Sequence, residues 1–118
     1  MDVEQVKEYC RSFPEAMEME SGHPANVLSY KIRGKNFAYF KTSEPEQWRF
    51  SFRVTPDRFL ELTDQPGIKP ARYMRRFHWV TVVDVNTIDS VYLKELVSWS
   101  FSKAVASLSK KAQAEINA

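Results

Sequence analysis

The sequence predicts an α+β fold: a two-layer sandwich in which helices cover one face of an antiparallel sheet. Three observations predict it. Amphipathic helical patterns lie near both ends of the chain, apolar and polar residues alternate in its middle, and turn signals separate the alternating segments. The chain has 118 residues, 43% of them hydrophobic, which fits a single domain over residues 1–118. The expected order is α-β-β-β-α-β-β-α.

The first helix is expected to run from Val3 to Phe13. Asp2 and Gln5 form a capping-box pattern at its start. Pro14 marks its end, because proline lacks the amide hydrogen that a helix needs. Residues 15–24 are acidic and contain glycine and proline, so they are expected to form a loop.

Two strands and a turn are expected next. The apolar residues of segment 28–33 alternate with polar ones, and residues 34–36 predict a turn. The returning strand is residues 37–40, and its pattern leaves open which side chains point to the core.

Segment 48–54 is the clearest strand pattern in the chain, because rings and polar residues alternate in it without a break. Its aromatic rings are expected to point to the core. Arg49, Ser51 and Arg53 are expected to point outward.

The second half of the chain begins with a short helix, which Thr55 caps and which ends before Pro66. An extended segment at residues 69–76 is expected to lead into a strand at 77–85. Asp89 caps the last helix, and the polar tail that follows at residues 109–118 is expected to fray.

Composition excludes several classes of protein. One cysteine, Cys10, cannot form an internal disulfide, and no Cys/His cluster has zinc-site spacing. No apolar run reaches the roughly 18 residues of a membrane helix, and the acidic N-terminus is unlike a signal peptide. We therefore expect a cytoplasmic monomer with no membrane contact and no cofactor.

Enzyme motifs are missing from the sequence. The histidines His23 and His78 accompany no nucleophile motif, and three glycines cannot form a phosphate-binding glycine loop. Cys10 lies on the apolar face of the first helix, where a buried structural thiol is its natural role. We expect neither a catalytic residue nor a metal ligand.

Charge is distributed unevenly along the chain, although the net charge is only +2. Residues 1–30 carry two basic and six acidic side chains, whereas residues 31–83 carry eleven basic and five acidic ones. Such a basic region suggests a polyanion partner. The alternative is that a soluble domain simply needs a charged surface.

Strand geometry makes the polyanion hypothesis specific, because side chains two residues apart in a strand share a face. Lys31 and Arg33 should emerge together, as should Arg49 and Arg53. The alternative is again structural, since charged residues on strands also prevent unwanted edge pairing.

One segment of the chain, Gly67-Ile68-Lys69-Pro70-Ala71-Arg72-Tyr73-Met74-Arg75-Arg76-Phe77-His78-Trp79-Val80-Thr81-Val82, resembles the MmcQ/YjbR family. The resemblance rests on the basic pair Arg75-Arg76, on His78-Trp79 and on Thr81-Val82. Further matches are the Cys10-to-Pro14 segment, the hairpin at residues 30–38, the strand-into-helix step at 52–56 and Ser100-Phe101.

The resemblance implies a two-layer α/β sandwich, likened to CyaY-like and type III secretion-chaperone folds, and a DNA-binding label that rests on analogy of fold. It implies no enzyme activity or cofactor. The recurrent family residues fall on Arg72, Tyr73, His78 and Trp79, and they serve either binding or packing. The residues expected to bind nucleic acid are Lys31, Arg33, Lys35, Arg49, Arg53, Arg72, Arg75, Arg76, His78 and Trp79.

Three hypotheses follow. The first is a DNA-binding module that uses a basic sheet face and the Arg72–Arg76 segment. The second is a protein-interaction or chaperone-like module that holds a partner on the open sheet face or in a groove beside Phe37 and Tyr39. The third is an enzyme that uses His78 in a pocket. The missing motifs favour the two binding hypotheses over the enzyme.

Overall fold

The antiparallel sheet contains six strands in the structure, a computed structural model that describes residues 1–117. The order across the sheet is β1-β2-β3-β4-β6-β5, and every neighbouring pair is antiparallel. The strands are β1 Met17–Ser21, β2 Val27–Ile32, β3 Lys35–Lys41, β4 Phe50–Arg53, β5 Ile68–Pro70 and β6 Trp79–Val82. The predicted fold class is confirmed.

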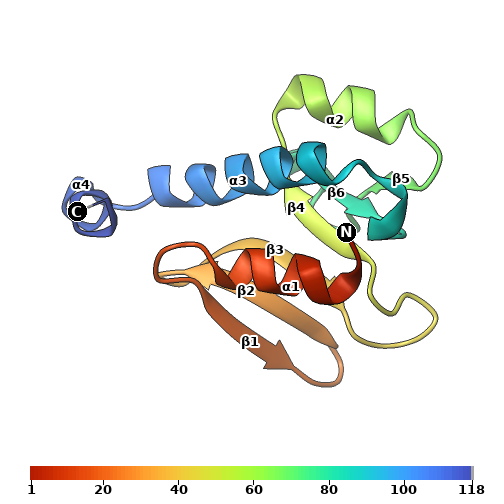
Figure 1. Ribbon diagram of the computed structural model, residues 1–118, viewed down its shortest axis with the longest axis horizontal. Helices are drawn as coiled ribbons and strands as arrows, with labels where there is room; N and C mark the ends of the chain where they lie inside the picture. The colour runs from red at the N-terminus through yellow and green to blue at the C-terminus, as the bar shows by residue number, and fades with distance from the viewer. Residues whose placement is uncertain (118) are drawn as a thin grey trace.

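Four α-helices and two short 3-10 helices accompany the sheet within the described residues (Figure 1). None of these helices is long and apolar enough to cross a membrane. The α-helices are α1 Val3–Arg11, α2 Pro56–Thr63, α3 Ser90–Ala106 and α4 Lys110–Ile116, and the 3-10 helices are η1 Arg75–Phe77 and η2 Val85–Thr87.

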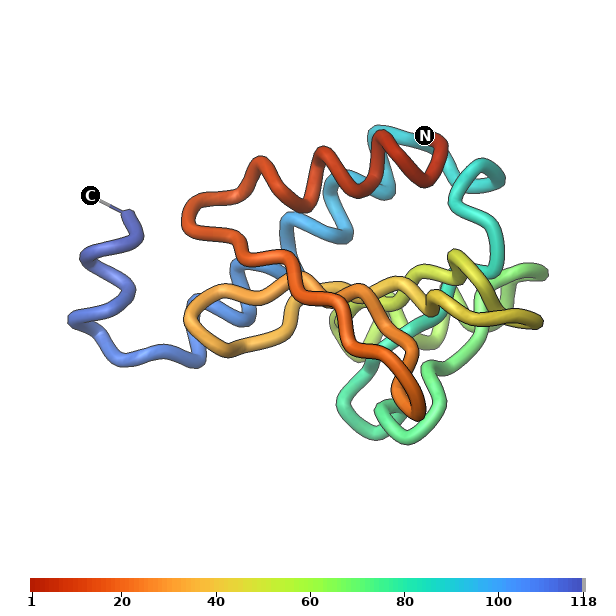
Figure 2. Tube along the Cα trace, turned by 90° about the horizontal axis from the view of Figure 1, so that it is seen from below, coloured from red at the N-terminus to blue at the C-terminus, as the bar shows by residue number. Residues whose placement is uncertain are grey.

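Helices α1 and α3 lie side by side on the same face of the sheet (Figures 1 and 2). The hydroxyl of Tyr9 in α1 donates to the carbonyl of Lys94 in α3 at 3.1 Å. Helix α2 joins this layer through Arg58, which donates to the Tyr92 hydroxyl of α3 at 3.2 Å. The opposite face of the sheet carries no α-helix within residues 1–117, and we call it the open face.

The expected helix starts are confirmed. Asp2 and Gln5 form the capping box at α1, with each side chain accepting from the other residue's amide at 2.8 and 3.0 Å. Thr55 caps α2 by accepting from the amide of Arg58, and Asp89 caps α3 in the same way.

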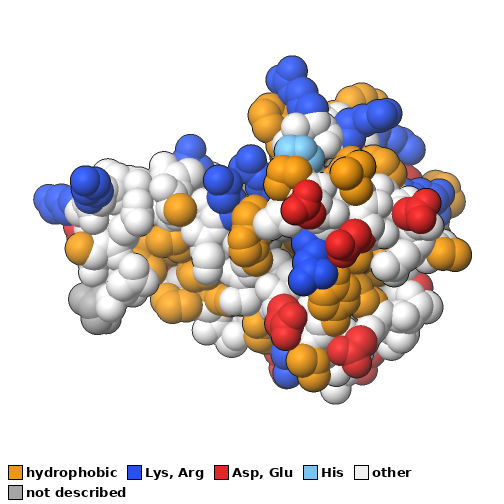
Figure 3. All heavy atoms as spheres, turned by 90° about the horizontal axis from the view of Figure 1, so that it is seen from above, with side chains coloured by type: hydrophobic (Ala, Val, Ile, Leu, Met, Phe, Trp, Pro, Cys, Tyr) orange, Lys and Arg blue, Asp and Glu red, His pale blue; other side chains and the backbone are white. Residues whose placement is uncertain are grey.

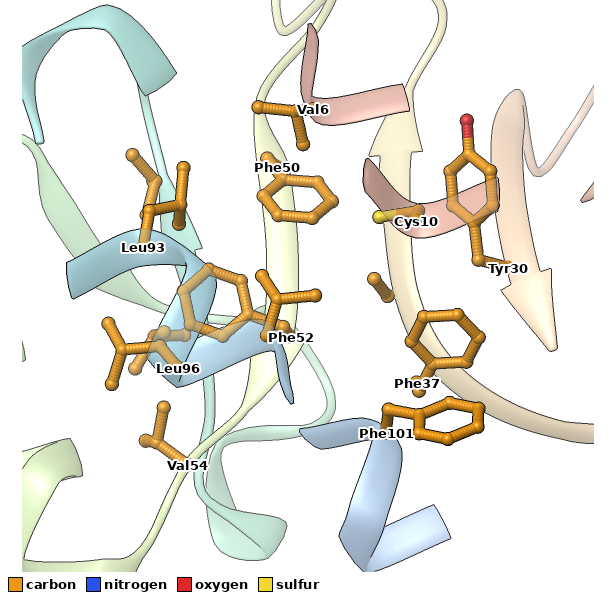
Figure 4. Packing of buried hydrophobic residues seen from close by; sticks show 14 of the residues in the cluster. Val6, Cys10, Tyr30, Phe37, Phe50, Phe52, Val54, Leu93, Leu96 and Phe101 are labelled. Carbon is orange, nitrogen blue, oxygen red and sulfur yellow. The ribbon is translucent and has the colours of Figure 1, made fainter. Parts of the chain in front are cut away.

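Aromatic rings fill the core between the helices and the sheet (Figure 4). Phe13, which follows α1, stacks on Phe101 of α3 with ring centroids 4.5 Å apart. Phe37 of β3 meets the ring of Phe101 edge-on at 5.2 Å. These contacts join both helices to the middle of the sheet, because each ring removes a large apolar area from water.

A bulge in β3 decides which way its side chains point. Ala38 pairs with Tyr30 and Asn36 pairs with Lys31, so Phe37 is an extra residue in the strand. Phe37 therefore points to the core together with its neighbour Ala38, although adjacent residues of a regular strand point to opposite faces. The bulge settles the orientation that the sequence pattern of this strand leaves open.

Ser100 of α3 holds the bulge against the next strand. Its hydroxyl donates to the carbonyl of Phe37 at 2.6 Å and accepts from the amide of Arg53 in β4 at 3.1 Å. Ser100 is 1% exposed, so water does not replace these bonds. One hydroxyl therefore satisfies two buried backbone groups at the point where the pairing of β3 with β4 ends.

The prediction that residues 15–24 form a loop is wrong in part, because residues Met17–Ser21 form strand β1. Met17 and Met19 of this edge strand share one face and alternate with Glu18 and Glu20, but both methionines are exposed, at 61% and 46%. Polar contacts hold it instead: Glu18 accepts from Tyr30 Oη at 2.7 Å and from Arg11 Nε at 2.8 Å. Burial opposes ionisation of Glu18, but the hydrogen bonds from Arg11 and Tyr30, together with the positive charges of Arg11 and Lys7, lower the pKa of the carboxyl.

Two further expectations are wrong in detail. The tail expected to fray forms α4 over Lys110–Ile116, because Ser109 caps the helix and Ile116 is buried against the core; Ala118 lies outside the described residues. The strand expected at residues 77–85 is shorter, since η1 ends at Phe77 and His78 has a left-handed backbone with φ 63°. His78 therefore lies in a turn before β6 and not in the strand.

We predict that Ser100→Ala lowers the free energy of unfolding by about 1–3 kcal/mol, because it leaves a buried amide and a buried carbonyl without partners. Urea denaturation followed by circular dichroism measures this loss. Ser102→Ala on the exposed side of the same helix is the matched control, with an expected change within about 0.5 kcal/mol. Equal effects of the two substitutions would contradict the bridging role of the hydroxyl.

Candidate functional site

The open face of the sheet presents a row of side chains that pairing brings together from five strands. Ser29 lies opposite Tyr39, Tyr39 opposite Ser51, Ser51 opposite Thr81, and Thr81 opposite Lys69. The Ser51 and Thr81 hydroxyls are hydrogen-bonded at 2.7 Å. Tyr39, Ser51, Thr81 and Lys69 of this row form the floor of the candidate site.

Two loops rise from this floor on the side away from α1 and α3. They are the β1–β2 loop and the segment after β5, and Figure 2 shows both below the sheet. Between them lies a cavity of about 440 Å³. Its lining residues are Pro24, Ala25, Val27, Tyr39, Lys41, Glu46, Arg49, Ser51, Lys69, Pro70, Arg72, Tyr73 and Thr81.

Positive charge dominates the cavity. Lys41, Arg49, Lys69 and Arg72 line it, and within residues 1–117 Glu46 is the only acidic residue that does so. These five side chains carry a formal net charge of +3. Figure 3 shows the same polarity over a wider surface: Lys and Arg side chains gather at its upper edge, whereas most Asp and Glu side chains lie lower.

Glu46 lies between two of these cations. Its Oε2 is 3.4 Å from Nη1 of Arg49 and 3.6 Å from Nη2 of Arg72. The side chains of Glu46 and Arg49 are 29% and 26% exposed, but Arg72 is 71% exposed, so its ion pair is screened by solvent. A carboxylate therefore already occupies the space between two guanidinium groups that point toward the cavity.

Aromatic rings support one side of the floor. The ring of Tyr39 stacks on that of Trp79 with centroids 5.8 Å apart, and Trp79 is 5% exposed. Trp79 is therefore a support for Tyr39 and not a surface that a ligand can reach. Tyr73 differs, because it is 89% exposed at the rim of the cavity.

The structure brings together only some of the basic residues expected to bind nucleic acid. Arg49 and Arg72 line the cavity. Arg53 lies opposite Trp79, one row beyond the floor, and Lys31 lies at the bulge between β2 and β3. Ser51 faces outward as expected, but it is 2% exposed because Thr81 and the surrounding side chains cover it.

Arg33 does not emerge beside Lys31, which corrects the expectation for this strand. Arg33 lies in the β2–β3 turn with φ 47°, where its guanidinium pairs with Glu15 at 3.0 Å and with Glu115 of α4 at 3.2 Å. The hydrogen bond from Arg33 lowers the pKa of Glu15. Lys35 is the first residue of β3 after this turn, and neither Arg33 nor Lys35 lines the cavity.

The η1 segment places its basic residues outside the cavity lining as well. Arg75 and Arg76 are exposed, and the guanidinium of Arg76 lies 4.8 Å from the ring centre of Phe77. His78 packs edge-on against Phe59 of α2, with ring centroids 5.6 Å apart. His78 is thus part of the contact between the segment and α2.

Sequence reasoning missed Lys41, Lys69, Glu46 and Thr81. Lys41 and Arg49 are eight positions apart, but the amide of Lys41 donates to the carbonyl of Arg49 at 2.9 Å. Lys69 reaches the floor because β5 pairs with β6 in a register that places it opposite Thr81. Lys41 lies two residues after Tyr39, so the alternation of β3 predicts that the two side chains share a face. The pairing of the three-residue β5 with β6 cannot be predicted from the sequence pattern.

The structure also bears on the groove expected beside Phe37 and Tyr39 and on the enzyme hypothesis that uses His78. Phe37 is fully buried and Tyr39 points to the open face, so the two residues do not line one groove. Neither histidine lines the cavity. Among the residues that the structure describes, no group of three or more His, Cys, Asp and Glu could hold a metal ion.

The arrangement defines a two-layer α+β domain with a cationic cavity on the uncovered side of its sheet. Residues 11–103 match the YjbR family model, so the chain belongs to the YjbR family. Among curated proteins it is similar to the uncharacterized protein YbdF of Escherichia coli O157:H7, with 27% identity over 110 residues, which are 92% of this chain and 81% of the relative.

Solved structures share the fold. A protein of Deinococcus radiodurans, DR2400, whose domain is described as DUF419, has a TM-score of 0.83 and 24% identity. The match covers 98% of this chain and 88% of that one. A protein from Pseudomonas syringae has a TM-score of 0.69 and 19% identity, over 88% of this chain and 99% of its own.

We predict that Cys10 does not react with a thiol reagent in the native protein. The thiol is fully buried on α1, and burial raises its pKa, so almost no reactive thiolate forms at neutral pH. Labelling with Ellman's reagent should reach completion only after the protein is unfolded in denaturant. Rapid labelling without denaturant would show that the thiol is accessible and restore it as a candidate nucleophile.

Proposed function

We propose that this protein is a non-catalytic DNA-binding module that holds phosphates against the open face of its sheet. The observation that carries the proposal is the convergence of Lys41, Arg49, Lys69 and Arg72 around one cavity. These residues come from β3, the β3–β4 connection, β5 and the segment after β5. Four cations from separate parts of the chain are consistent with binding to an anion.

The chemistry of the cations fits phosphate. Guanidinium groups of arginine match phosphate oxygens with two parallel hydrogen bonds, and lysine adds a compact charge. The Ser51 and Thr81 hydroxyls on the floor are bonded to each other, which leaves one hydroxyl hydrogen of the pair for a further acceptor. Each phosphate that pairs with a cation releases counterions, so binding of this kind weakens as salt rises.

The non-catalytic part of the proposal rests on what lines the cavity. A serine nucleophile needs a neighbouring base, usually histidine, to take its proton. Within residues 1–117, no histidine lines the cavity, and the hydroxyl of Ser51 is bonded to that of Thr81. Holding a ligand without reacting with it is the simpler use of these groups.

We predict that the double variant Lys69→Gln/Arg72→Gln binds DNA about tenfold or more weakly at low salt, because both exposed side chains lose their charge at the cavity. The slope of log affinity against log salt should fall by about 1.4–1.8, since two phosphate contacts are removed. Fluorescence anisotropy with a labelled oligonucleotide measures both quantities.

The control for this pair is Lys110→Gln/Lys111→Gln, which makes the same change of charge on the exposed side of α4. It should leave affinity and slope nearly unchanged. If wild-type protein at micromolar concentration binds no oligonucleotide at about 50 mM salt, the proposed function is wrong. Equal losses in both double variants would place binding outside the cavity.

We predict that Glu46→Gln strengthens DNA binding about threefold or more. The carboxylate of Glu46 competes with phosphate for Arg49 and Arg72, and glutamine has the same shape without the charge. Glu8→Gln on the exposed side of α1 is the matched control and should change affinity little. Unchanged or weaker binding by Glu46→Gln would show that phosphate does not approach these two arginines.

A further inference from the structure

The shape of the cationic cavity limits what can enter it. Its volume of about 440 Å³ lies within the roughly 300–1,000 Å³ of pockets that hold one small molecule. Direct readout of base edges in the major groove of duplex DNA uses an inserted helix or two-stranded ribbon, which requires a protruding element. Here the cations line a cavity together with residues of the β1–β2 loop and of the segment after β5, and Figure 2 shows the backbone of both segments below the sheet.

Tyr73 at the rim is not explained by packing within this chain. Its side chain is 89% exposed, and its backbone has a left-handed conformation with φ 68°, which residues other than glycine disfavour. An exposed ring in an unfavourable backbone conformation adds little to folding. The ring is nevertheless placed directly at the cavity that Arg72 also lines.

The remaining uncharged lining suits the flat parts of a nucleotide. Tyr39 lies on the floor, where its stacking on Trp79 fixes the ring. Pro24, Val27 and Pro70 add apolar surface without donors that select a base. Proteins that bind single-stranded nucleic acid combine basic side chains that contact the phosphates with aromatic rings on which the bases stack.

We propose that the ligand of this cavity is a single-stranded nucleic acid, one nucleotide of which enters the cavity while a base stacks on Tyr73. This inference rests on the proposed function, because it assigns the phosphates of the strand to the same cations. A duplex keeps its bases stacked on one another, so it offers Tyr73 no free base.

The test compares a fluorescein-labelled thymidine oligonucleotide of about 12 nucleotides with a duplex of the same length, at about 50 mM salt. Wild-type protein should bind the single strand at least about tenfold more tightly. Tyr73→Ala should weaken single-strand binding about fivefold or more, and Tyr73→Phe should restore it, because phenylalanine keeps the ring face. Phe77→Ala, an exposed ring outside the cavity lining, is the control and should bind like wild type.

The outcomes separate this inference from the proposed function. Duplex binding as tight as single-strand binding would overturn the inference, and if that binding is still lost in Lys69→Gln/Arg72→Gln, the proposed function stands. Single-strand binding that Tyr73→Ala leaves intact also overturns the inference. Binding of neither probe overturns both.

Discussion

The bridge that Ser100 makes between β3 and β4 is the constraint on which both faces of the sheet depend. By accepting from the Arg53 amide and donating to the Phe37 carbonyl, it supports the bulge in β3. The bulge turns Phe37 into the core, where it meets Phe101, and leaves Tyr39 on the opposite face. A single buried hydroxyl therefore links the packing of α3 to the floor of the cationic cavity.

Sequence reasoning was accurate where local chemistry decides the structure. The caps at Asp2, Thr55 and Asp89 depend on one side chain and an amide three residues away, so a short motif contains all the information. It failed at β1, although Met17 and Met19 alternate with Glu18 and Glu20, because both methionines are exposed and the contacts of Glu18 with Tyr30 and Arg11 are set by tertiary structure. It also failed at α4, whose burial of Ile116 depends on the rest of the fold.

In the candidate site, too, the features that depend on local sequence were predictable and those that depend on tertiary structure were not. Alternation correctly placed Ser51 on the outer face, and the basic character of the middle of the chain led to Arg49 and Arg72. Which cations converge depends on strand register and on loops, and both are non-local. Arg33 was expected on the same surface, but the turn directs it to Glu15 and Glu115. Lys69 was overlooked, because only the pairing of β5 with β6 brings it to the floor.

The two outer strands of the sheet have a consequence for how the molecule behaves at high concentration. Uncovered strand edges invite neighbouring molecules to add strands, and charged side chains or prolines at the edge oppose this. β1 carries the exposed carboxylate of Glu20, and β5 is three residues long and ends at Pro70, which has no amide hydrogen to offer. Both edges of the sheet thus carry features that oppose the addition of a strand from a neighbouring molecule.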